Sequence, residues 1–320
     1  MKPITEHSPE DLTIDEVWQR FSTDDAAREY LEGIRWPDGP VCPHCGNAAD
    51  KAKIWKVEAD PEKEIRPGLY ECGNCDKQFT VTVGTIFEDS HVPLRKWMVA
   101  WWLINTSKKG ISALQIQRML GLGSYRTALF MMHRIRHALQ DPAFTGKLSG
   151  TVEIDETYVG GKQRGVGSGS KEGKTPVVSL VERGGDKRSQ IMERVTGKNL
   201  RQAIKDNVEI CSRVMTDDSF AYRGLVPKYD HAAVKHSRGE YVRGDVHTNT
   251  VEGSFSLLKR GIVGTFHSVS RKHLPLYLAE FDHRWNHRKV SDGQRTVAGL
   301  RKVSGRRLTY KKLVGRGRRF

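Results

Sequence analysis

Two aspartates in apolar, strand-like segments have the setting of a divalent-metal site. Asp155 lies within Thr151–Val159, which is rich in β-branched and apolar residues and is followed by glycines. Asp217 follows a short apolar run in Ser212–Asp218, so we expect it at the C-terminal tip of a strand. Carboxylate oxygens are hard ligands that suit Mg²⁺ or Mn²⁺. Two such ions about 3.5–4 Å apart can hold a phosphoryl group for in-line displacement.

A third carboxylate, Glu252, lies in a segment with the pattern of an amphipathic helix. The segment His247–Gly261 begins with polar and threonine residues that suit a helix N-terminus. Apolar residues then share one helical face, at Val251, Phe255, Leu258 and Ile262. Glu252 lies beside this stripe, at the edge of the buried face. A lone glutamate there is an ordinary surface charge, but with two strand-borne aspartates it can complete a metal site.

These motifs resemble those of bacterial insertion-sequence transposases, and they are most similar to the ISXO-like group of DDE transposases. The similarity covers roughly residues 40–290 and rests on Asp155-Glu-Thr-Tyr-Val-Gly-Gly-Lys162, Thr216-Asp217 and His247-Thr-Asn-Thr-Val-Glu252. Asp217 and Glu252 differ by 35 in number (252 − 217), a separation typical of that superfamily. The resemblance implies an RNase H-like catalytic core. In that core Asp155, Asp217 and Glu252 would be the catalytic residues and would hold two Mg²⁺ or Mn²⁺ ions.

Neighbouring polar residues leave the ligand set open. Glu156 and Asp218 adjoin the two aspartates and could replace them as ligands. Some members of related groups carry asparagine at the third catalytic position, and Asn249 is available beside Glu252. His247 and Asn249 are also predicted as auxiliary residues that orient Glu252 or the nucleophilic water.

Four of the five cysteines form two Cys-x-x-Cys pairs, Cys42 with Cys45 and Cys72 with Cys75. Four thiolates complete the tetrahedral shell of one structural Zn²⁺ ion, so we predict a zinc ribbon over residues 41–90. Its strands are expected in Lys53–Val57, Leu69–Glu71 and Gln78–Val83. A pair of disulfides is a poor alternative in a cytoplasmic chain. The ribbon could contact DNA or another protein.

Helical periodicity flanks the ribbon on both sides. Residues 1–40 are predicted to form a helical lead-in, with Thr23 or Asp24 as the cap of a second helix. Residues 91–141 have a helix-turn-helix-like layout, with Ser112 as an N-cap and a glycine-containing turn before the third helix. The residues then expected to face DNA are Ser124, Tyr125, Arg126 and Arg134. A generic helical bundle with a tryptophan core is the alternative.

The catalytic domain is predicted over residues 148–290 as an α/β fold. After its first strand, further strands are expected at Val177–Val181 and Gln190–Val195. Asn199 is the expected cap of a helix from Leu200 to Ile210.

Basic residues occur where they could contact DNA phosphates. Lys162 and Arg164 lie in a glycine-rich loop, and Lys259 and Arg260 lie near the end of the amphipathic helix. The basic tail, residues 291–320, has few large apolar residues, so we expect a partly disordered arm that binds nucleic acid. A solubilising terminus is the alternative.

The composition favours a polyanionic partner. The 320 residues include 53 Lys and Arg against 38 Asp and Glu, a formal net charge of +15. Such a basic chain is suited to nucleic acid, and double-stranded DNA is the expected partner. The sequence has no run of about 20 apolar residues that could span a bilayer, and its start lacks the apolar core of a secretory signal. We therefore expect a cytoplasmic, nucleoid-associated protein.

The sequence thus predicts a multidomain α+β DNA transposase with N-terminal helices, a zinc ribbon, a helix-turn-helix-like module, an RNase H-like α/β catalytic domain and a basic tail. It would bind the repeats at the ends of an element, hydrolyse phosphodiester bonds there and join the freed 3′-hydroxyl ends to target DNA. A homodimer or larger assembly is expected at synapsed ends. The alternatives are a non-catalytic DNA-binding regulator derived from a transposase and a metal-dependent nuclease.

Overall fold

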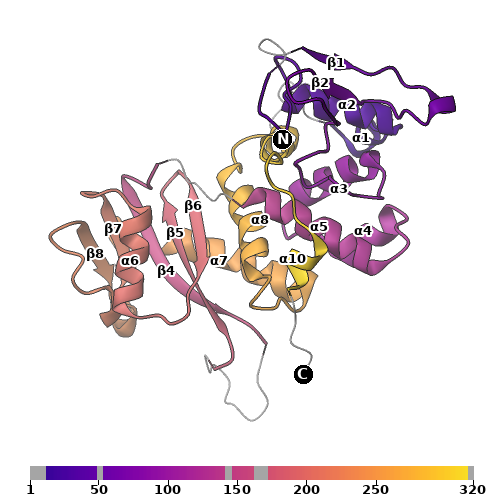
Figure 1. Ribbon diagram of the computed structural model, residues 1–320. Coiled ribbons are helices and arrows are strands. Elements are labelled where there is room, and N and C mark those ends of the chain that lie inside the picture. Colours follow the sequence, from indigo (N-terminus) through magenta and orange to yellow (C-terminus); the bar gives the residue numbers. More distant parts are fainter. Residues whose placement is uncertain (1–11, 49–52, 141–145, 162–171, 316–320) are drawn as a thin grey trace, which may run out of the picture. The chain divides into compact units, whose positions relative to one another are not determined.

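The chain divides into two units. The computed structural model describes residues 12–48, 53–140, 146–161 and 172–315. The first unit consists of Met1–Leu139 and Val290–Phe320, and the second of Gln140–Lys289 (Figure 1). Within the described ranges, none of the helices has both the length and the apolar character needed to traverse a bilayer. The finer domain boundaries proposed from the sequence remain predictions.

Most helices of the first unit begin at a capping hydroxyl. Up to residue 139 the helices are α1 (Ile14–Arg20), α2 (Asp24–Arg35), α3 (Leu94–Thr106), α4 (Ala113–Met119) and α5 (Tyr125–Leu139). The hydroxyls of Thr13, Thr23, Ser112 and Ser124 accept hydrogen bonds from first-turn amides of α1, α2, α4 and α5. These bonds satisfy amides that have no partner within the helix. The predicted caps Thr23 and Ser112 are confirmed.

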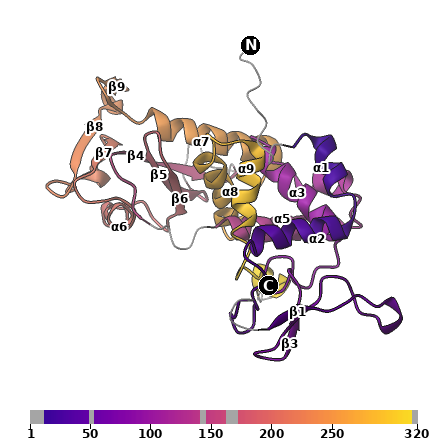
Figure 2. The ribbon, with the colours of Figure 1, turned by 90° about the horizontal axis from the view of Figure 1, so that it is seen from above.

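The core of the first unit is built around two tryptophans of α3. Trp97 and Trp101 are only 1% and 0% exposed. Helix α9 (Asp292–Leu300) lies beside α3 and α5 in this core (Figure 2). The indole nitrogen of Trp101 donates a hydrogen bond to the carbonyl of Thr296 at 3.2 Å. A Cβ atom on Gly299 would lie 3.1 Å from the same nitrogen, so glycine permits this close approach.

The basic tail therefore belongs partly to a folded core. The expectation of a disordered arm is wrong for Asp292–Leu300, and Leu300 and Val303 are buried. The short helix α10 (Tyr310–Val314) follows, and the last five residues lie outside the described chain. Apolar residues of this segment, such as Val297 and Leu300, lie on the buried side of α9. The overall composition of the segment does not show this arrangement.

The four paired cysteines lie in and around a small antiparallel sheet. Its strands, in spatial order, are β1 (Ile54–Lys56), β2 (Tyr70–Cys72) and β3 (Lys77–Phe79). The predicted continuation of the third strand to Val83 is wrong, because the chain turns after Phe79. The amide of Val83 donates to the carbonyl of Thr80, and the hydroxyls of Thr80 and Thr82 are hydrogen-bonded at 2.8 Å. Such local bonds compete with strand pairing.

A five-stranded mixed sheet forms the centre of the second unit. Its strands are β4 (Thr151–Val159), β5 (Thr175–Glu182), β6 (Lys187–Ile191), β7 (Arg213–Asp217) and β8 (Asp230–Val234). Their spatial order is β6-β5-β4-β7-β8. The first three strands pair antiparallel, whereas β7 is parallel to β4 and β8 is parallel to β7. A separate two-stranded ribbon consists of β9 (Val242–Arg243) and β10 (Val246–His247).

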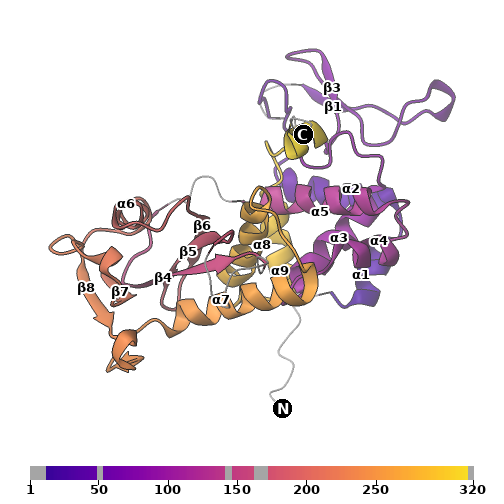
Figure 3. The ribbon, with the colours of Figure 1, turned by 90° about the horizontal axis from the view of Figure 1, so that it is seen from below.

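Helices cover both faces of this sheet (Figure 3). They are α6 (Gly197–Asn207), α7 (Asn249–Gly261) and α8 (Leu274–Asn286). Leu200 of α6 belongs to the same apolar cluster as Ile154 of β4. Leu258 of α7 and Leu278 of α8 instead belong to the cluster of Val159. Because side chains alternate along a strand, even-numbered residues of β4 face α6 and odd-numbered ones face α7.

Two elements of this unit begin earlier than predicted. Strand β6 replaces the expected strand at Gln190–Val195, because the charged residue Lys187 is buried in it, with its Nζ 3.4 Å from Oδ1 of Asp282. Helix α6 is capped by Thr196, whose hydroxyl accepts from the amide of Asn199, the predicted cap. The first difference arises from a charged side chain that finds its partner inside the fold, and the second from a local capping bond three residues long.

Candidate active site and zinc site

Strands β4 and β7 bring Asp155 and Asp217 side by side. Glu153 lies opposite Met215 in the parallel register. Two residues further along each strand, the same register places Asp155 (153 + 2) opposite Asp217 (215 + 2). Because side chains alternate along strands, both aspartates are on the face of Glu153 and Met215. Asp217 is the last residue of β7, so the pair lies at the carboxyl end of that strand.

Helix α7 carries Glu252 over the same face of the sheet. The predicted apolar stripe is buried, at Val251, Phe255, Leu258 and Ile262. Val251 and Phe255 pack against Val181 of β5, and Glu252 stays partly exposed at the edge of this contact. Its Oε1 accepts a hydrogen bond from the hydroxyl of the buried Thr248 at 2.7 Å. The helix therefore brings the third carboxylate to the side of the sheet that holds the aspartates.

The electrostatics of Asp155 link the three acids. Its pKa is raised to about 7, mainly because the carboxyl is buried. The neighbouring carboxylates of Glu156, Asp217 and Glu252 also raise this pKa, while a hydrogen bond from the amide of Glu156 lowers it. A cation bound at this place would relieve the repulsion among the acids.

Each of the three carboxylates also has a local hydrogen-bond donor. Asp155 accepts from the amide of Glu156 at 2.7 Å, and Asp217 accepts from the amide of Ser219 at 3.1 Å. Among the described residues, only the four cysteines bring three or more ligand atoms all within 4.8 Å of one another. The acids are thus neighbours without a closed ligand shell. Their all-oxygen donor set and shared repulsion fit Mg²⁺ or Mn²⁺.

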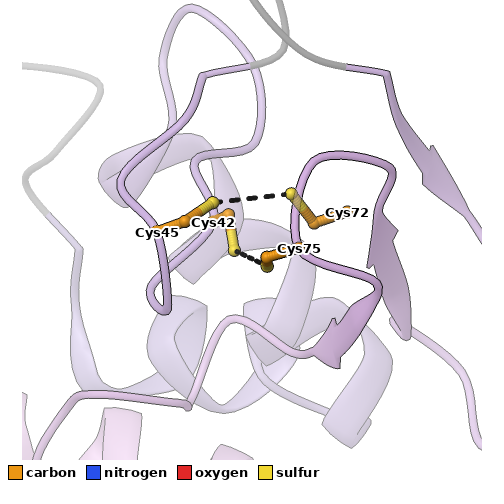
Figure 4. A group of neighbouring side chains, drawn as sticks. All are labelled: Cys42, Cys45, Cys72 and Cys75. Atoms are coloured by element: carbon orange, nitrogen blue, oxygen red, sulfur yellow. Dashed lines mark hydrogen bonds between the residues drawn. The ribbon is translucent and has the colours of Figure 1, made fainter.

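The cysteine cluster has the dimensions of a tetrahedral metal site. The sulfurs of Cys42 and Cys75 are 3.7 Å apart, as are those of Cys45 and Cys72 (Figure 4). Zn–S bonds of about 2.3 Å in a tetrahedron place sulfurs about 3.8 Å apart. A hydrogen bond from the backbone amide of Asn47 lowers the pKa of the Cys45 thiol to about 6, which favours the thiolate that binds metal. Burial raises the pKa of the Cys42 and Cys75 thiols, so a bound cation would have to displace their protons.

Two family models and one relative match this sequence. The sequence matches the ISXO2-like transposase domain over residues 147–286 and the transposase zinc-ribbon domain over residues 22–78. An uncharacterized protein in transposable element ISH50 of Halobacterium salinarum is 33% identical over 291 residues, which are 82% of this chain and 91% of that protein. The chain belongs to the ISXO2-like transposase family. The resemblance inferred from the motifs is confirmed, and the zinc-ribbon match together with the cysteine cluster supports a structural Zn²⁺ ion in this transposase.

The alternative ligands of the transposase have different surroundings. Glu156 belongs to the α6 side of β4, and its Oε2 accepts a hydrogen bond from the hydroxyl of Tyr222 at 2.7 Å. Asp218 accepts a hydrogen bond from the hydroxyl of Ser237. Asn249 is the exposed first residue of α7. Strand alternation thus separates Glu156 from the face that holds Asp155.

Sequence reasoning missed Glu153, a fully buried acid of the same strand. The carboxylate of Glu153 accepts hydrogen bonds from the amides of Thr250 and Val251 at the start of α7. It also contacts Arg183 and His247, so His247 is tied to Glu153. Alternation could have placed Glu153 on the face of Asp155, two residues away, but nothing local indicated its burial.

The residues predicted to bind DNA differ in their exposure to solvent. Arg126, Lys259 and Arg260 are exposed, on α5 and α7. Lys162 and Arg164 lie outside the described residues.

The expectation that Arg134 faces DNA is wrong. This residue is 4% exposed, its guanidinium lies over the ring of Trp97, and it donates to the carbonyl of Glu88. Its position along α5 is on the core side of the helix. The distinction between Arg126 and Arg134 therefore depends on packing.

Proposed function

We propose that this protein is a DNA transposase that cuts phosphodiester bonds at the ends of its element and joins the freed 3′-hydroxyls to target DNA. One observation carries the proposal. Asp155 and Asp217 are neighbours on one face of paired parallel strands, and α7 carries Glu252 over that face. Membership of the transposase family supports the same conclusion.

The topology of the second unit supports an RNase H-like assignment. Three antiparallel strands are followed by two parallel strands that add on the other side of the first, in the order β6-β5-β4-β7-β8. This arrangement places the carboxyl end of β7 beside the middle of β4. Aspartates from two different parts of the chain can therefore act on one phosphate.

In the proposed mechanism Asp155, Asp217 and Glu252 would hold two Mg²⁺ or Mn²⁺ ions. When bound, these ions would neutralise charge on the phosphate and activate the attacking oxygen. Water attacks the phosphorus at the element end, and the bond to the 3′ oxygen breaks to leave a 3′-hydroxyl. That hydroxyl then attacks a target phosphate and displaces a target 3′ oxygen. Each step is an in-line displacement, so the chain positions the reactants without a covalent protein intermediate.

The auxiliary residues are assigned to orientation. We propose that His247 supports the start of α7 through its contact with Glu153, and that Glu156 orders the chain after β7 through Tyr222. Asn249 stays the competing candidate for the third catalytic position, because it lies one turn before Glu252 on the same helix.

Double-stranded DNA at the element ends and at the target is the proposed partner. Helices α4 and α5, joined by a turn in which Gly121 has a φ of +56°, support a helix-turn-helix-like module with Arg126 at the exposed start of the second helix. Lys259 and Arg260 on α7, with Lys162 and Arg164, would contact phosphates. We further propose a homodimer or larger assembly at synapsed ends, in the cytoplasm and associated with the nucleoid.

The deciding experiment is a strand-transfer assay with Mg²⁺ or Mn²⁺ on DNA that carries the repeats flanking the gene. Wild type would be compared with Asp155→Ala, Asp217→Ala, Glu252→Ala and Asn249→Ala. We expect joined products in the wild type and a loss of at least about 10³-fold in the first three variants, since each removes a ligand of the reacting metal ions. Gel-shift binding to the same DNA should persist in all variants.

Other outcomes select among the alternatives. Activity that survives Glu252→Ala and is lost in Asn249→Ala would move the third catalytic position. Cleavage without joining would indicate a metal-dependent nuclease. Tight binding without cleavage by any protein would indicate a DNA-binding regulator.

A further inference from the structure

Glu153 lies at the centre of a buried hydrogen-bond network that joins β4 to α7. Its side chain is 0% exposed. One oxygen, Oε2, accepts from the amides of Thr250 and Val251 at 2.7 and 3.0 Å. The other, Oε1, accepts from the hydroxyl of Thr250 at 2.8 Å and from Nε of Arg183 at 2.6 Å. A buried carboxylate is stable only with donors of this kind, because burial removes its hydration.

The network extends to the chain segment that precedes α7. Arg183, which follows β5, donates to the carbonyls of Asp245 and His247 at 2.7 and 3.0 Å. Nδ1 of His247 lies 3.2 Å from Oε1 of Glu153. The strand β10 and the first turn of α7 are thereby held to the central strand through one carboxylate.

Glu153 and the amides that it binds lie close in sequence to two of the proposed catalytic acids. Glu153 is two residues before Asp155 on the same face of β4, and the amides that it accepts from lie one and two residues before Glu252 on α7. The first-turn amides of a helix are partly positive and have no partner inside the helix, so a carboxylate there fixes the start of the helix. A shift of α7 along β4 would break these bonds.

We propose that Glu153 is a positioning residue that fixes α7, and with it Glu252, relative to Asp155. The inference rests on the proposed function, because Glu252 and Asp155 are taken as ligands of the catalytic ions. Glu153 itself touches no substrate and no metal ion in this proposal. It acts through the amides of Thr250 and Val251. Loss of a residue that orients metal ligands in this way typically lowers metal affinity by about 10–100-fold.

The test compares Glu153→Gln with a matched control, Asp282→Asn. Both changes neutralise a buried carboxylate of the second unit. Asp282 of α8 accepts from the amide and hydroxyl of Ser189 at 2.7 and 2.8 Å and pairs with Lys187, on the edge strand β6. The control therefore reports what loss of a buried acid does to the fold without release of α7.

Two measurements are made on the zinc-loaded, full-length chain without DNA. Titration with Mn²⁺, followed by the electron paramagnetic resonance signal of free Mn²⁺, gives metal affinity. Hydrogen exchange resolved at Thr250 and Val251 reports whether the start of α7 is held. We expect Glu153→Gln to weaken Mn²⁺ binding by about 10–100-fold and to speed exchange at both amides by about tenfold or more. Asp282→Asn should leave both quantities unchanged.

Thr250→Val keeps the test decisive if Glu153→Gln does not fold. It removes one hydroxyl bond to Glu153 and preserves the shape and charge of the site. It should change affinity and exchange in the same direction by a smaller factor. Wild-type affinity and wild-type exchange in a folded Glu153→Gln or Thr250→Val protein would overturn the inference.

A further arm separates this inference from the proposed function. If wild type and Asp155→Ala bind Mn²⁺ equally, the acids hold no metal ion, and both the proposed function and the positioning role are overturned. If Asp155→Ala loses Mn²⁺ binding and Glu153→Gln retains it, only the positioning role fails.

Discussion

The carboxyl of Asp155 is held in an environment that opposes its ionisation. Burial is the main cause, and three neighbouring carboxylates add repulsion, so the pKa rises from the ordinary 3.8 to about 7. Without a cation, an aspartate in this place destabilises the fold near neutral pH. Strain of this kind is expected where a chain is built to bind a charged species.

We therefore expect Asp155→Asn to be more stable than the wild type when no divalent ion is present. Between pH 3.8 and about 7 the folded wild type binds more protons at Asp155 than the unfolded chain does, so its free energy of unfolding falls as pH rises through this window. The variant lacks this penalty and should gain on the order of 2–4 kcal/mol at pH 8, with little gain near pH 4. Urea denaturation in chelator at both pH values measures the difference. Equal stability at pH 8 would contradict the pKa assignment.

At the scale of elements, the zinc ribbon (β1 to β3 with the four cysteines) is a sheet of very short strands that a metal ion can hold together. Two turns present the cysteines, and the residue after each pair, Gly46 or Asp76, has a positive φ of 77° or 52°. The three strands of the sheet have three residues each. Strands this short form a marginal sheet, so we infer that metal binding supplies most of its stability.

Loss of the zinc ligands should unfold the ribbon without unfolding the second unit, which contains none of the four cysteines. We expect Cys72→Ser, or treatment with a strong chelator, to lose one Zn²⁺ per chain and the protease resistance of residues 53–79. The matched control is Cys211→Ser, because Cys211 lies outside the cluster. Zinc analysis and limited proteolysis with mass spectrometry report both effects. Full protease resistance of the metal-free ribbon would show that zinc is dispensable.

At the scale of the whole molecule, a net charge of +15 attracts a polyanion such as DNA and speeds their encounter. Exposed basic residues occur in both units, among them Arg126 on α5 and Lys259 on α7. Each phosphate that such a residue neutralises releases counterions from DNA.

DNA binding should therefore weaken steeply with salt, by about 0.9 log units of affinity per log unit of salt for each phosphate contacted. Lys259→Ala should make this slope shallower by roughly 0.9 if the lysine contacts one phosphate. Lys205→Ala removes the same charge from α6, on the opposite face of the sheet from α7, and should leave the slope unchanged. Fluorescence anisotropy between 50 and 200 mM salt, roughly the range in which such contacts weaken, gives all three slopes. A flat response in the wild type would exclude a phosphate-based interface.

The sequence by itself determined the features whose signals are local. The two Cys-x-x-Cys pairs, the caps Thr23 and Ser112 and the apolar stripe of α7 each lie within a few residues, and the order of the acidic motifs identified the transposase family. Backbone capping and helical periodicity need no distant partner, so these features could be inferred without a fold.

Only the tertiary structure decided which charged residues are buried. Glu153 finds the amide of Thr250 across 97 residues, and Lys187 finds Asp282 on another element. Arg134 and α9 likewise join the core of the first unit, through contacts that no local sequence pattern predicts. A charge can be buried only where distant donors or acceptors replace its hydration. The fold supplies those partners, and so it alone distinguishes a surface charge from a buried one.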